Sequence, residues 1–443
     1  MDSQISQTDV VVVGGGLAGL SAAYYLARAG VSVTLFEKAA SLGGRAATLN
    51  YDDYRFNRGI HALYTGGAAS EVLQELGVTY SGHSPKGVFL LLQGKLHMAP
   101  VDPLTLLRTD LLNIADKLEL MRLFTTIPRL DAHELRYMSV QEWLGHNIRR
   151  SLVHQLMEAL ARTYVYSAAL DIVSAEVFIV KMQITLKHPI HYIDGGWQTL
   201  VDELREKAEL AGTLIVSGTR VEAVEHEGGS AQGVRLRDGR IVGASAVIIA
   251  TSPRDAAKLV DEDAYAPLRQ VVNAVIPAQV ASLDVALSRL PDARHPVVQD
   301  LERPRFLSAQ SLFSRIAPQG GALIHAFKPL DPTRPTDPRE DERDLENLLD
   351  TVQQGWRDVL VKRYYLPRID AAGMLPTATG GGYAGRPGPQ VPGLANLYLV
   401  GDWIGEGFLV DASLGSARQV AQQLLRSGLL PMKKKIATGS RMQ

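Results

Sequence analysis

Cysteine is absent from the 443 residues of this sequence. Its absence excludes disulfide bonds, thiolate metal ligands, redox-active thiols and a thioether bond to a cofactor. The sequence also lacks a run of about 18 apolar residues, the length needed for a membrane-spanning helix. The first residues, "MDSQISQTD", lack the basic start of a signal peptide. We therefore expect a cytoplasmic protein, with association to a membrane surface as an alternative.

Strong net charge and metal-binding patterns are missing too. The formal net charge is −1, which provides no overall field to attract nucleic acid. The eleven histidines are scattered, and none pairs with another four residues away around an acid. We expect neither a nucleic-acid partner nor a metal site. Residues 433–443 are locally basic, and we expect them to form a flexible tail.

Glycines are concentrated in the stretch "VVVGGGLAGLSAAYYLARAG" at residues 11–30. The β-branched run before them predicts a buried parallel strand, and the apolar residues after them recur at helical spacing. In the pattern GxGxxG, the glycines permit a tight turn, let a diphosphate approach the backbone, and let helix and strand pack closely. The diphosphate would lie at the positive end of the helix. The residues of this predicted site are Gly14, Gly16, Leu17, Ala18 and Gly19.

A second predicted strand, "VSVTLFE", ends in Glu37, which Lys38 follows. A carboxylate about 20 residues after the glycine turn can accept hydrogen bonds from both ribose hydroxyls of an adenosine. The next segment, "SLGGRAAT", contains Gly44 and Arg45. A nicotinamide-binding domain has no use for this second glycine pair, which indicates a different dinucleotide.

With these residues the sequence resembles the flavin amine oxidoreductase superfamily, which includes monoamine oxidases, protoporphyrinogen oxidase and phytoene-type desaturases. The resemblance is strong over residues 8–62 and 392–425 and diffuse between them. It implies an FAD cofactor, which we expect to be non-covalent. It places Gly44 beside the diphosphate, and Arg45 near the diphosphate and the ribityl chain.

The stretch "NLYLVGDWIGEGFLVDASLGSARQVAQQLL" carries the second part of the resemblance. In the family the acid that corresponds to Asp402, after Gly401, binds the ribityl or diphosphate part of FAD. The helix that follows, from about Asp411, directs its N-terminus at the pyrimidine edge of the flavin. The resemblance implies further FAD contacts at Arg58, Gly59, Ile60 and His61, at Val221 and Thr251, and at Leu409, Val410 and Ala412.

The length of the chain suits two domains. We expect an α/β fold, in which a Rossmann-like FAD-binding domain with a parallel sheet contains an inserted α+β substrate-binding domain. The FAD-binding domain would comprise residues 1–84, 190–268 and 370–432, and the substrate-binding domain residues 85–189 and 269–369. Within the insert we predict a hairpin that turns at Gln93-Gly94 and a helix capped by Ser139 and Glu142. The charged helix "DPREDERDLENLLDTV" should face solvent.

The flavin itself would supply the chemistry, so no protein nucleophile is required. His61 is a candidate proton-transfer group, or else a histidine that donates to a backbone carbonyl. Amine oxidases of the family place two facing aromatic rings over the flavin, and this makes Phe408 and Trp403 candidate substrate contacts. Lys328 is the candidate for the family's lysine that holds a water near N5. Asp411 replaces a glycine that is usual in the family, which disfavours a simple amine oxidase.

We predict an FAD-dependent oxidoreductase that transfers a hydride from an apolar organic substrate to flavin N5. It would be a dehydrogenase or desaturase of the phytoene desaturase or protoporphyrinogen oxidase type, with O2 or a quinone as electron acceptor. The first alternative is an amine oxidase that oxidises a C–N bond and releases H2O2. The second is a non-catalytic relative that binds prenyl groups or lipids. Peripheral contact of the helical insert with a membrane is left open, as is the oligomeric state.

Overall fold

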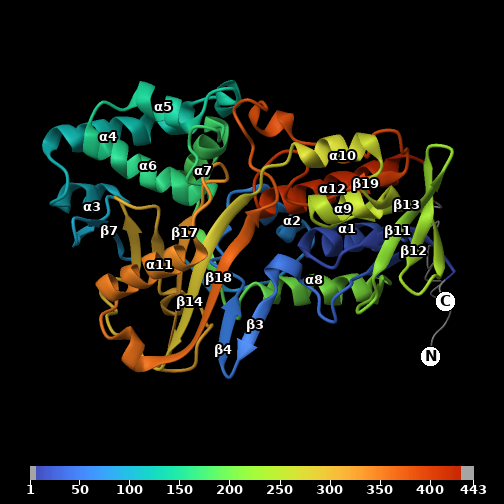
Figure 1. Cartoon of the computed structure of the whole chain (residues 1–443), viewed down its shortest axis with the longest axis horizontal. Coiled ribbons are helices and arrows are strands. Elements are labelled where there is room, and N and C mark those ends of the chain that lie inside the picture. The colour runs from blue at the N-terminus through green and yellow to red at the C-terminus, as the bar shows by residue number, and fades with distance from the viewer. Residues whose placement is uncertain (1–5, 431–443) are drawn as a thin grey trace, which may run out of the picture.

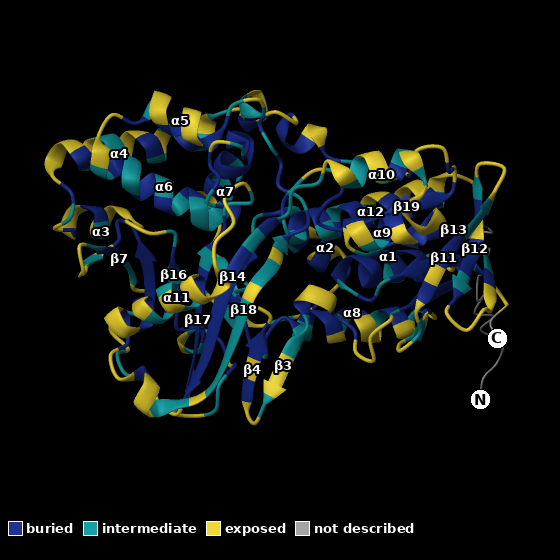
Figure 2. Cartoon of the chain, in the orientation of Figure 1, coloured by how far each residue is buried: buried dark blue, intermediate teal, exposed yellow. Residues whose placement is uncertain are grey.

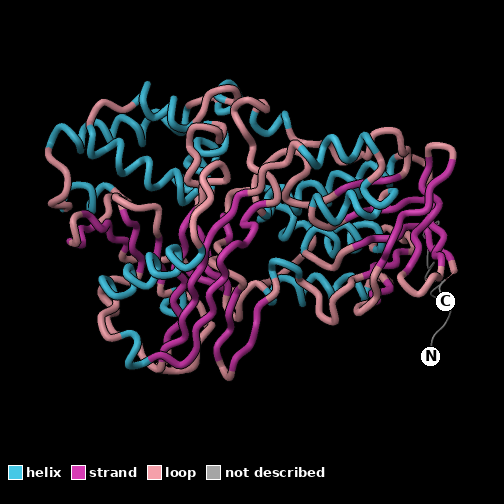
Figure 3. Tube along the Cα trace, in the orientation of Figure 1, coloured by secondary structure: helices cyan, strands magenta, loops and turns pink. Residues whose placement is uncertain are grey.

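The computed structural model describes residues 6–430 of the chain, so the predicted basic tail lies outside the described residues. Figure 1 shows two β-sheets side by side along the long axis of the molecule, each with helices packed against it. Parallel and antiparallel strands both occur, and the fold is a mixed α/β fold. Figure 3 shows loop segments in the region between the two sheets.

The first sheet combines strands from the beginning, middle and end of the chain. Its strands in spatial order are β10 (Leu214–Val216), β2 (Val33–Phe36), β1 (Gln7–Val13), β13 (Ile241–Ile249), β12 (Ser230–Leu236) and β11 (Val221–Glu227), with β19 (Leu397–Leu399) beside the end of β13. The strands β10, β2, β1, β13 and β19 are parallel, whereas β12 and β11 are antiparallel to their neighbours. The carboxyl ends of the parallel strands therefore share one edge, where ligands of such sheets usually bind.

Alternating residues of β1 bury both faces of this sheet. Val10 and Val12 contribute to one apolar cluster, and Val11 and Val13 contribute to the cluster on the opposite face. The first face is covered by α1 (Leu17–Ala27), α2 (Ala68–Glu75), α8 (Gln198–Leu210) and α12 (Val410–Arg426), and the second by α9 (Pro253–Leu259) and α10 (Ala266–Asn273). A β-branched run buried on both faces is what the sequence predicts.

The second sheet is mainly antiparallel. Its strands in spatial order are β18 (Leu360–Ala372), β14 (Ala278–Leu287), β17 (Ala322–Pro329), β16 (Phe306–Ser308), β15 (Val297–Asp300), β7 (Val88–Leu92) and β8 (Lys95–Met98). The helix α11 (Pro338–Val352) covers one face. The helical group on the other side comprises α3 (Pro103–Arg108), α4 (Ile114–Thr126), α5 (Val140–Asn147), α6 (Ser151–Val165) and α7 (Ala175–Lys187). Figure 2 shows the dark, buried strands between these layers.

Short elements complete the structure. Two small sheets consist of β3 (Thr48–Tyr51) with β4 (Tyr54–Asn57), and of β5 (Leu63–Tyr64), β9 (Ile190–Ile193) and β6 (Gly82–His83). The 3-10 helices are η1 (Gly44–Ala46), η2 (Ile127–Arg129), η3 (Ala132–Leu135), η4 (Asp261–Asp263), η5 (Gln310–Leu312), η6 (Trp356–Val359) and η7 (Gly382–Gly385). Among the helices of residues 6–430, none is long and apolar enough to cross a membrane.

Two local predictions are confirmed. The hairpin of β7 and β8 turns at Gln93 and Gly94, which both have positive φ. The capping box of Ser139 and Glu142 begins α5.

The expectation that the charges of α11 all face solvent is wrong. Asp341 is fully buried beneath the helix, where its carboxylate lies 3.1 Å from Lys328 and 3.0 Å from Arg368. A second acid of the same helix, Asp344, lies 2.9 Å from Lys328. The helical face that carries these acids packs on the sheet, because the two cations on β17 and β18 compensate their charge.

We expect Asp341→Asn to lower the free energy of unfolding by about 1–3 kcal/mol, because it removes the buried carboxylate that pairs with Lys328 and Arg368. Burial raises the pKa of Asp341, but hydrogen bonds from Thr336, Arg368 and Lys328 outweigh it and hold the pKa below its usual range. This stabilisation is therefore complete above the pKa of the unfolded chain and is lost as pH falls through the folded value. Urea unfolding at several pH values tests this.

The matched control is Glu340→Gln, because Glu340 is the exposed neighbour of Asp341 on the same helix. It should change the free energy of unfolding by less than about 0.5 kcal/mol. Equal effects of the two substitutions would contradict the role of the buried carboxylate.

Candidate functional site

The glycine turn between β1 and α1 is sterically constrained at two of its three glycines. Gly14 has φ of +114°, and a Cβ there would lie 2.6 Å from the carbonyl oxygen of Ala250. A Cβ on Gly19 would lie 2.0 Å from the carbonyl oxygen of Gly14. In contrast, the nearest neighbour of a Cβ on Gly16 would be the carbonyl oxygen of Gly43, at 3.9 Å. The turn therefore packs tightly behind Gly14 and Gly19 and is open in front of Gly16.

The N-terminus of α1 lies at this open position. Gly16 is the N-cap and provides no side-chain hydrogen bond, so the first N–H groups of the helix, at Leu17 and Ala18, have no side-chain acceptor. The helices α3, α4, α5, α7, α9 and α11 are all capped by an Asp, Asn or Ser side chain. Uncapped N–H groups together with the helix dipole suit an anion.

Glu37 lies against the same turn, directly after β2. Its Oε2 accepts a hydrogen bond of 2.7 Å from the N–H of Gly15, and its Oε1 accepts one of 2.8 Å from the N–H of Ala39. The second glycine pair runs alongside, since the N–H of Gly43 donates to the carbonyl of Gly15 at 2.9 Å. Gly44 follows it and is exposed. The predicted positions 14–19, 37 and 44 are therefore adjacent in space.

Lys38 and Val221 border this region from outside. Lys38 is exposed and pairs with Asp255 at 3.0 Å. It lines a surface hollow of about 470 Å³ together with Thr219, Arg220 and Arg237. Val221 is buried at the start of β11, next to these residues.

Arg45 and Asp402 bring the two ends of the chain together. The guanidinium of Arg45 donates two hydrogen bonds to the Asp402 carboxylate, one of them 2.6 Å long, and the N–H of Gly373 donates a third at 2.6 Å. Burial disfavours the charged carboxylate, but Arg45 outweighs it and lowers the pKa of Asp402. Half of the Arg45 side chain remains accessible, whereas only 5% of the Asp402 side chain does. Arg45 therefore presents a cation above a buried anion.

Gly401, Thr251 and Trp403 form a corner beside this ion pair. Gly401 has φ of +146°, and its N–H donates to the hydroxyl of Ser416 on α12 at 3.0 Å. The indole N–H of Trp403 donates to the carbonyl of Thr251 at 3.0 Å. Trp403 is 1% exposed and packs in the apolar cluster on the α9 side of the first sheet. The structure thus places Trp403 inside the protein core.

The start of α12 has an unusual backbone. Leu409, the N-cap, has φ of 56° and ψ of −129°, which is strained for a residue with a branched side chain. The helix has no side-chain cap at this end, and Val410 and Ala412 lie in its first turn. Strain of this kind is concentrated at functional sites, so we include these three residues in the candidate site.

Asp411 has a structural task that its sequence position did not reveal. Its Oδ1 accepts a hydrogen bond of 2.9 Å from the N–H of Ala69 in α2, and its Oδ2 lies 3.1 Å from the Nζ of Lys181 on α7. The ammonium group of Lys181 also lies 4.1 Å from the ring centre of Tyr64. Gly67 leaves room for the carboxylate, because a Cβ there would meet it at 2.2 Å. A buried ion pair therefore connects the helices of the two sheets.

The segment 58–61 approaches the second sheet. The Nδ1 of His61 lies 3.0 Å from the carbonyl oxygen of Gly59, and burial is the main cause that lowers the pKa of His61 to about 4. The ring is therefore neutral at pH 7, as for a histidine that donates to a backbone carbonyl. Arg58 is exposed, and Ile60 packs against the apolar cluster of the helical group.

Buried polar side chains lie under this segment. Asp284 on β14 faces His325 on β17, with 2.9 Å between Oδ1 and Nδ1, and the hydroxyl of Ser282 donates to Asp284 at 2.9 Å. A Cβ on Gly59 would lie 3.8 Å from the Ser282 hydroxyl. All three side chains are at most 1% exposed, so they support the segment from below.

Phe408 and Lys328 complete the predicted positions. Phe408 is 1% exposed and packs in the apolar cluster of the helical group with Tyr166 and Tyr383. Lys328 is held by the two acids of α11, Asp341 and Asp344, so its ammonium group is already paired. The structure therefore places Phe408 in the apolar cluster of the helical group, and it pairs Lys328 with two acids.

Sequence reasoning missed several residues of the region. Arg386, in the Gly/Pro-rich loop before β19, donates to the backbone carbonyls of Gly407 and Asp402, and burial lowers its pKa to about 10. Lys181 and the pair Asp284–His325 were missed as well. A single charge inside an apolar helix or strand, as at Lys181 in "EVFIVKMQI", was the available signal.

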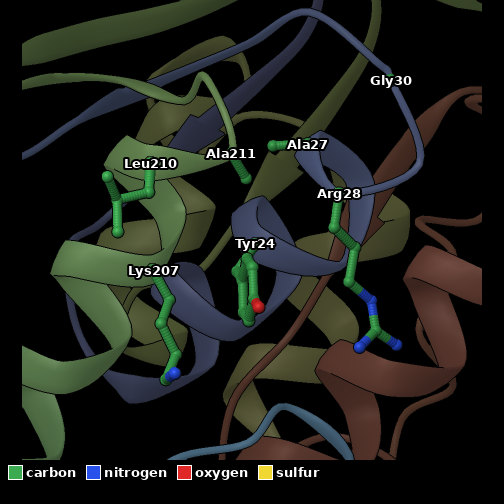
Figure 4. Close-up of a pocket in the computed structure, with 7 residues that line it drawn as sticks. All are labelled: Tyr24, Ala27, Arg28, Gly30, Lys207, Leu210 and Ala211. Carbon is green, nitrogen blue, oxygen red and sulfur yellow. The ribbon is translucent and has the colours of Figure 1, made fainter. Parts of the chain in front are cut away.

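A hollow elsewhere on the first sheet is separate from these residues. It has a volume of about 500 Å³, lies between α1 and α8, and is lined by Tyr24, Arg28, Lys207 and Leu210 among others (Figure 4). These residues belong to the C-terminal ends of both helices, whereas the candidate site adjoins the N-terminus of α1. Within residues 6–430, no group of three or more His, Asp or Glu side chains could hold a metal ion.

The fold is similar to that of FAD-dependent oxidoreductases. An oxidoreductase from Methanosarcina mazei superposes with a TM-score of 0.75 at 20% identity, over 94% of this chain and all of that one. A putrescine oxidase mutant superposes with a TM-score of 0.73 at 16% identity, over 95% of this chain and 99% of that one.

The family is established by sequence. The model of flavin-containing amine oxidoreductases matches residues 17–425, and the chain therefore belongs to this family. A coproporphyrinogen III oxidase from Propionibacterium freudenreichii is 24% identical over 79% of this chain and 77% of its own length. A carotenoid 3,4-desaturase from Haloarcula japonica is 58% identical over 57 residues, which are 13% of this chain and 12% of that protein. The protein is an FAD-dependent oxidoreductase with desaturase-like and oxidase-like relatives.

We expect Gly19→Ala to lower the free energy of unfolding of the cofactor-free protein by about 1–3 kcal/mol, because the new methyl group would overlap the Gly14 carbonyl. Gly16→Ala should change it by less than about 0.5 kcal/mol, because φ at Gly16 is −80° and the space is open. Thermal and urea unfolding measure both. An equal loss of unfolding free energy in Gly16→Ala and Gly19→Ala would contradict the open space in front of Gly16.

Proposed function

We propose that the chain binds FAD non-covalently in a Rossmann-type domain formed by the first sheet and oxidises an apolar organic substrate by hydride transfer. When bound, the flavin supplies the hydride acceptor at N5. The chain's own residues would bind the diphosphate and ribose, orient the ring system and exclude water. The proposed FAD contacts are Gly14, Gly16, Leu17, Ala18, Gly19, Glu37, Lys38, Gly44, Arg45, Arg58, Gly59, Ile60, His61, Val221, Thr251, Gly401, Asp402, Leu409, Val410 and Ala412.

The described residues fit a dinucleotide. The open face of Gly16 and the uncapped N–H groups of α1 suit a diphosphate, and the half-accessible guanidinium of Arg45 adds a cation. Glu37 lies beside the turn, at the distance along the chain that suits a ribose. These observations support FAD at the carboxyl edge of the first sheet.

We further propose the domain division that the sequence suggests. Residues 1–84, 190–268 and 370–432 would form the FAD-binding domain, and residues 85–189 and 269–369 the inserted substrate-binding domain. The two sheets support this division, although β18 of the second sheet continues to Ala372. The active site would then lie where the two sheets face each other.

An interior of neutral aromatic rings is the observation that favours an apolar substrate. Tyr64 and Tyr164 pack edge to face, with 6.4 Å between their ring centres, and Tyr166 stacks on Phe327 at 5.5 Å. Burial raises the pKa of these three tyrosines, so their hydroxyl groups stay uncharged. Phe408 belongs to the same apolar cluster as Tyr166 and Phe327. A large apolar molecule would contact such a surface favourably.

Three acids lie near this interior. Asp411 pairs with Lys181, Asp284 lies 2.9 Å from His325, and Glu176 lies 3.2 Å from His133. The charge of Asp411 is therefore already balanced by a lysine. Phe408 and Trp403 are each 1% exposed and pack in different apolar clusters, so these two rings give no support to a two-ring amine cage.

Hydride removal from carbon must be accompanied by loss of a proton from the neighbouring atom if a double bond is to form. We propose O2 or a quinone as the final electron acceptor. Because the apolar walls exclude water, they would protect the reduced cofactor and the oxidised substrate from side reactions.

Glu37→Ala should weaken FAD binding by about 1–3 kcal/mol, because charge-assisted hydrogen bonds to the ribose would be lost. Titration of the apoprotein with FAD, followed by flavin fluorescence, measures this. Glu206→Ala, which removes an exposed acid from α8, is the matched control and should bind FAD normally. Unchanged affinity in Glu37→Ala would contradict the assigned ribose contact.

The substrate class is tested by anaerobic mixing of the FAD-loaded protein with a polyene hydrocarbon, a reduced porphyrin and a set of primary amines. We expect flavin bleaching with an apolar compound and none with the amines. Bleaching by amines, with peroxide released on admission of air, would establish the amine oxidase alternative instead. Acid precipitation of the same protein should release all of the flavin, since no cysteine is available for a thioether bond.

A further inference from the structure

Exposed apolar side chains are concentrated on one pair of helices. Sixteen large apolar side chains are exposed within residues 6–430, and five of them lie on α3 and α4. Two of the five, Leu107 and Ile114, are 70% and 79% exposed. We call this set the α3–α4 surface, and its members are Leu104, Leu107, Ile114, Leu118 and Met121.

The helical geometry presents these side chains in two adjacent rows. Residues 104 and 107 are one turn apart on α3, and residues 114, 118 and 121 follow one side of α4. The opposite sides are anchored in the core by Leu106 and Leu120. Lys117 connects the rows, since its Nζ donates to the carbonyl of Leu107 at 2.8 Å. Figures 1 and 2 show both helices at the end of the molecule remote from β11 and β12.

Both helices begin with a capping box. Asp102 accepts hydrogen bonds from two N–H groups of α3, and Asn113 accepts one from the N–H of Asp116 in α4. The apolar rows are therefore carried by well-formed helices. Large exposed apolar patches on a folded surface mark contact with another phase or partner.

Of the acids near the surface, two lie beside a basic side chain, whereas Asp102 and Glu119 have no ion-pair partner in the described part of the chain. Asp116 is buried and pairs with Arg150 at 2.7 Å, and Asp110 pairs with His97 at 3.0 Å. Glu119 accepts hydrogen bonds of 2.9 Å from the N–H groups of Arg149 and Arg150.

Three cations of the same region have no ion-pair partner among residues 6–430. Arg108 and Arg122 are exposed, and in the described part of the chain neither forms an ion pair. Arg122 and Lys117 donate only to backbone carbonyls. Positive charge therefore borders the apolar rows on both helices.

We propose that the α3–α4 surface docks on a lipid bilayer that contains anionic lipids. The leucine and isoleucine side chains would enter the boundary of the acyl region, while Arg108, Lys117 and Arg122 contact the headgroups. Three cations without an ion-pair partner in the described part of the chain, beside an apolar face, favour this occupant over a second copy of the chain. A two-fold contact would place the same cations opposite one another, which is repulsive.

The experiment is sedimentation of the FAD-loaded full chain with vesicles of phosphatidylcholine, alone or mixed with phosphatidylglycerol. We expect binding to the mixed vesicles that weakens in high salt. The double variant Leu107→Asp/Ile114→Asp should bind about tenfold more weakly. Arg108→Glu should reduce the preference for the anionic vesicles.

The matched control is Leu210→Asp on α8, which makes the same change at a side chain that is 81% exposed. It should bind vesicles like the unaltered protein, and thermal unfolding should show that all variants are folded. Absence of vesicle binding by the unaltered protein would overturn the proposal. An equal loss of vesicle binding in Leu210→Asp and in Leu107→Asp/Ile114→Asp would overturn it too. Self-association that Leu107→Asp/Ile114→Asp abolishes, without vesicle binding, would identify an interface between copies and also overturn it.

Discussion

The ion pair between Arg45 and Asp402 is the interaction on which the candidate site depends. It connects residues 357 positions apart in the chain and holds the early glycine segment against the corner before α12. Asp402 is buried, so without the guanidinium its charge would be costly. Because Gly373 also donates to this carboxylate, the end of β18 is tied to the same point. Three distant segments therefore share one charge-compensated junction.

A second charge-compensated contact joins the two layers. Lys181 and Asp411 form a buried ion pair between helices that pack on different sheets, and within the second sheet Asp284 accepts a hydrogen bond from Ser282. Paired in this way, polar groups can stay in a largely apolar interior. The aromatic and aliphatic side chains of the apolar cluster that contains Phe408 are the basis of our proposal that the substrate is apolar. The family is named for amine oxidation, but its fold supports several chemistries, and the lining residues decide among them.

Local sequence patterns were sufficient to predict much of the secondary structure. The glycine turn, the first strands and helix, the hairpin at Gln93-Gly94 and the capping box at Ser139 all depend on residues within a few positions of each other. The adjacency of Glu37 to the turn followed from the parallel arrangement of β1 and β2. The acids of α11 were misjudged, because a charged pattern does not reveal that cations on neighbouring strands compensate Asp341.

The sequence by itself determined the glycine turn between a buried strand and a helix, where we propose the diphosphate, and the absence of any cysteine thiol. Only the tertiary structure decided which charges lie inside and what they pair with. Lys181 and Asp411 are 230 positions apart, and Arg386 supports a loop whose position depends on both sheets. The physical reason is that backbone conformation and hydrophobic periodicity are encoded locally. The energy of a buried charge, in contrast, is set by partners that only folding brings within a few ångströms.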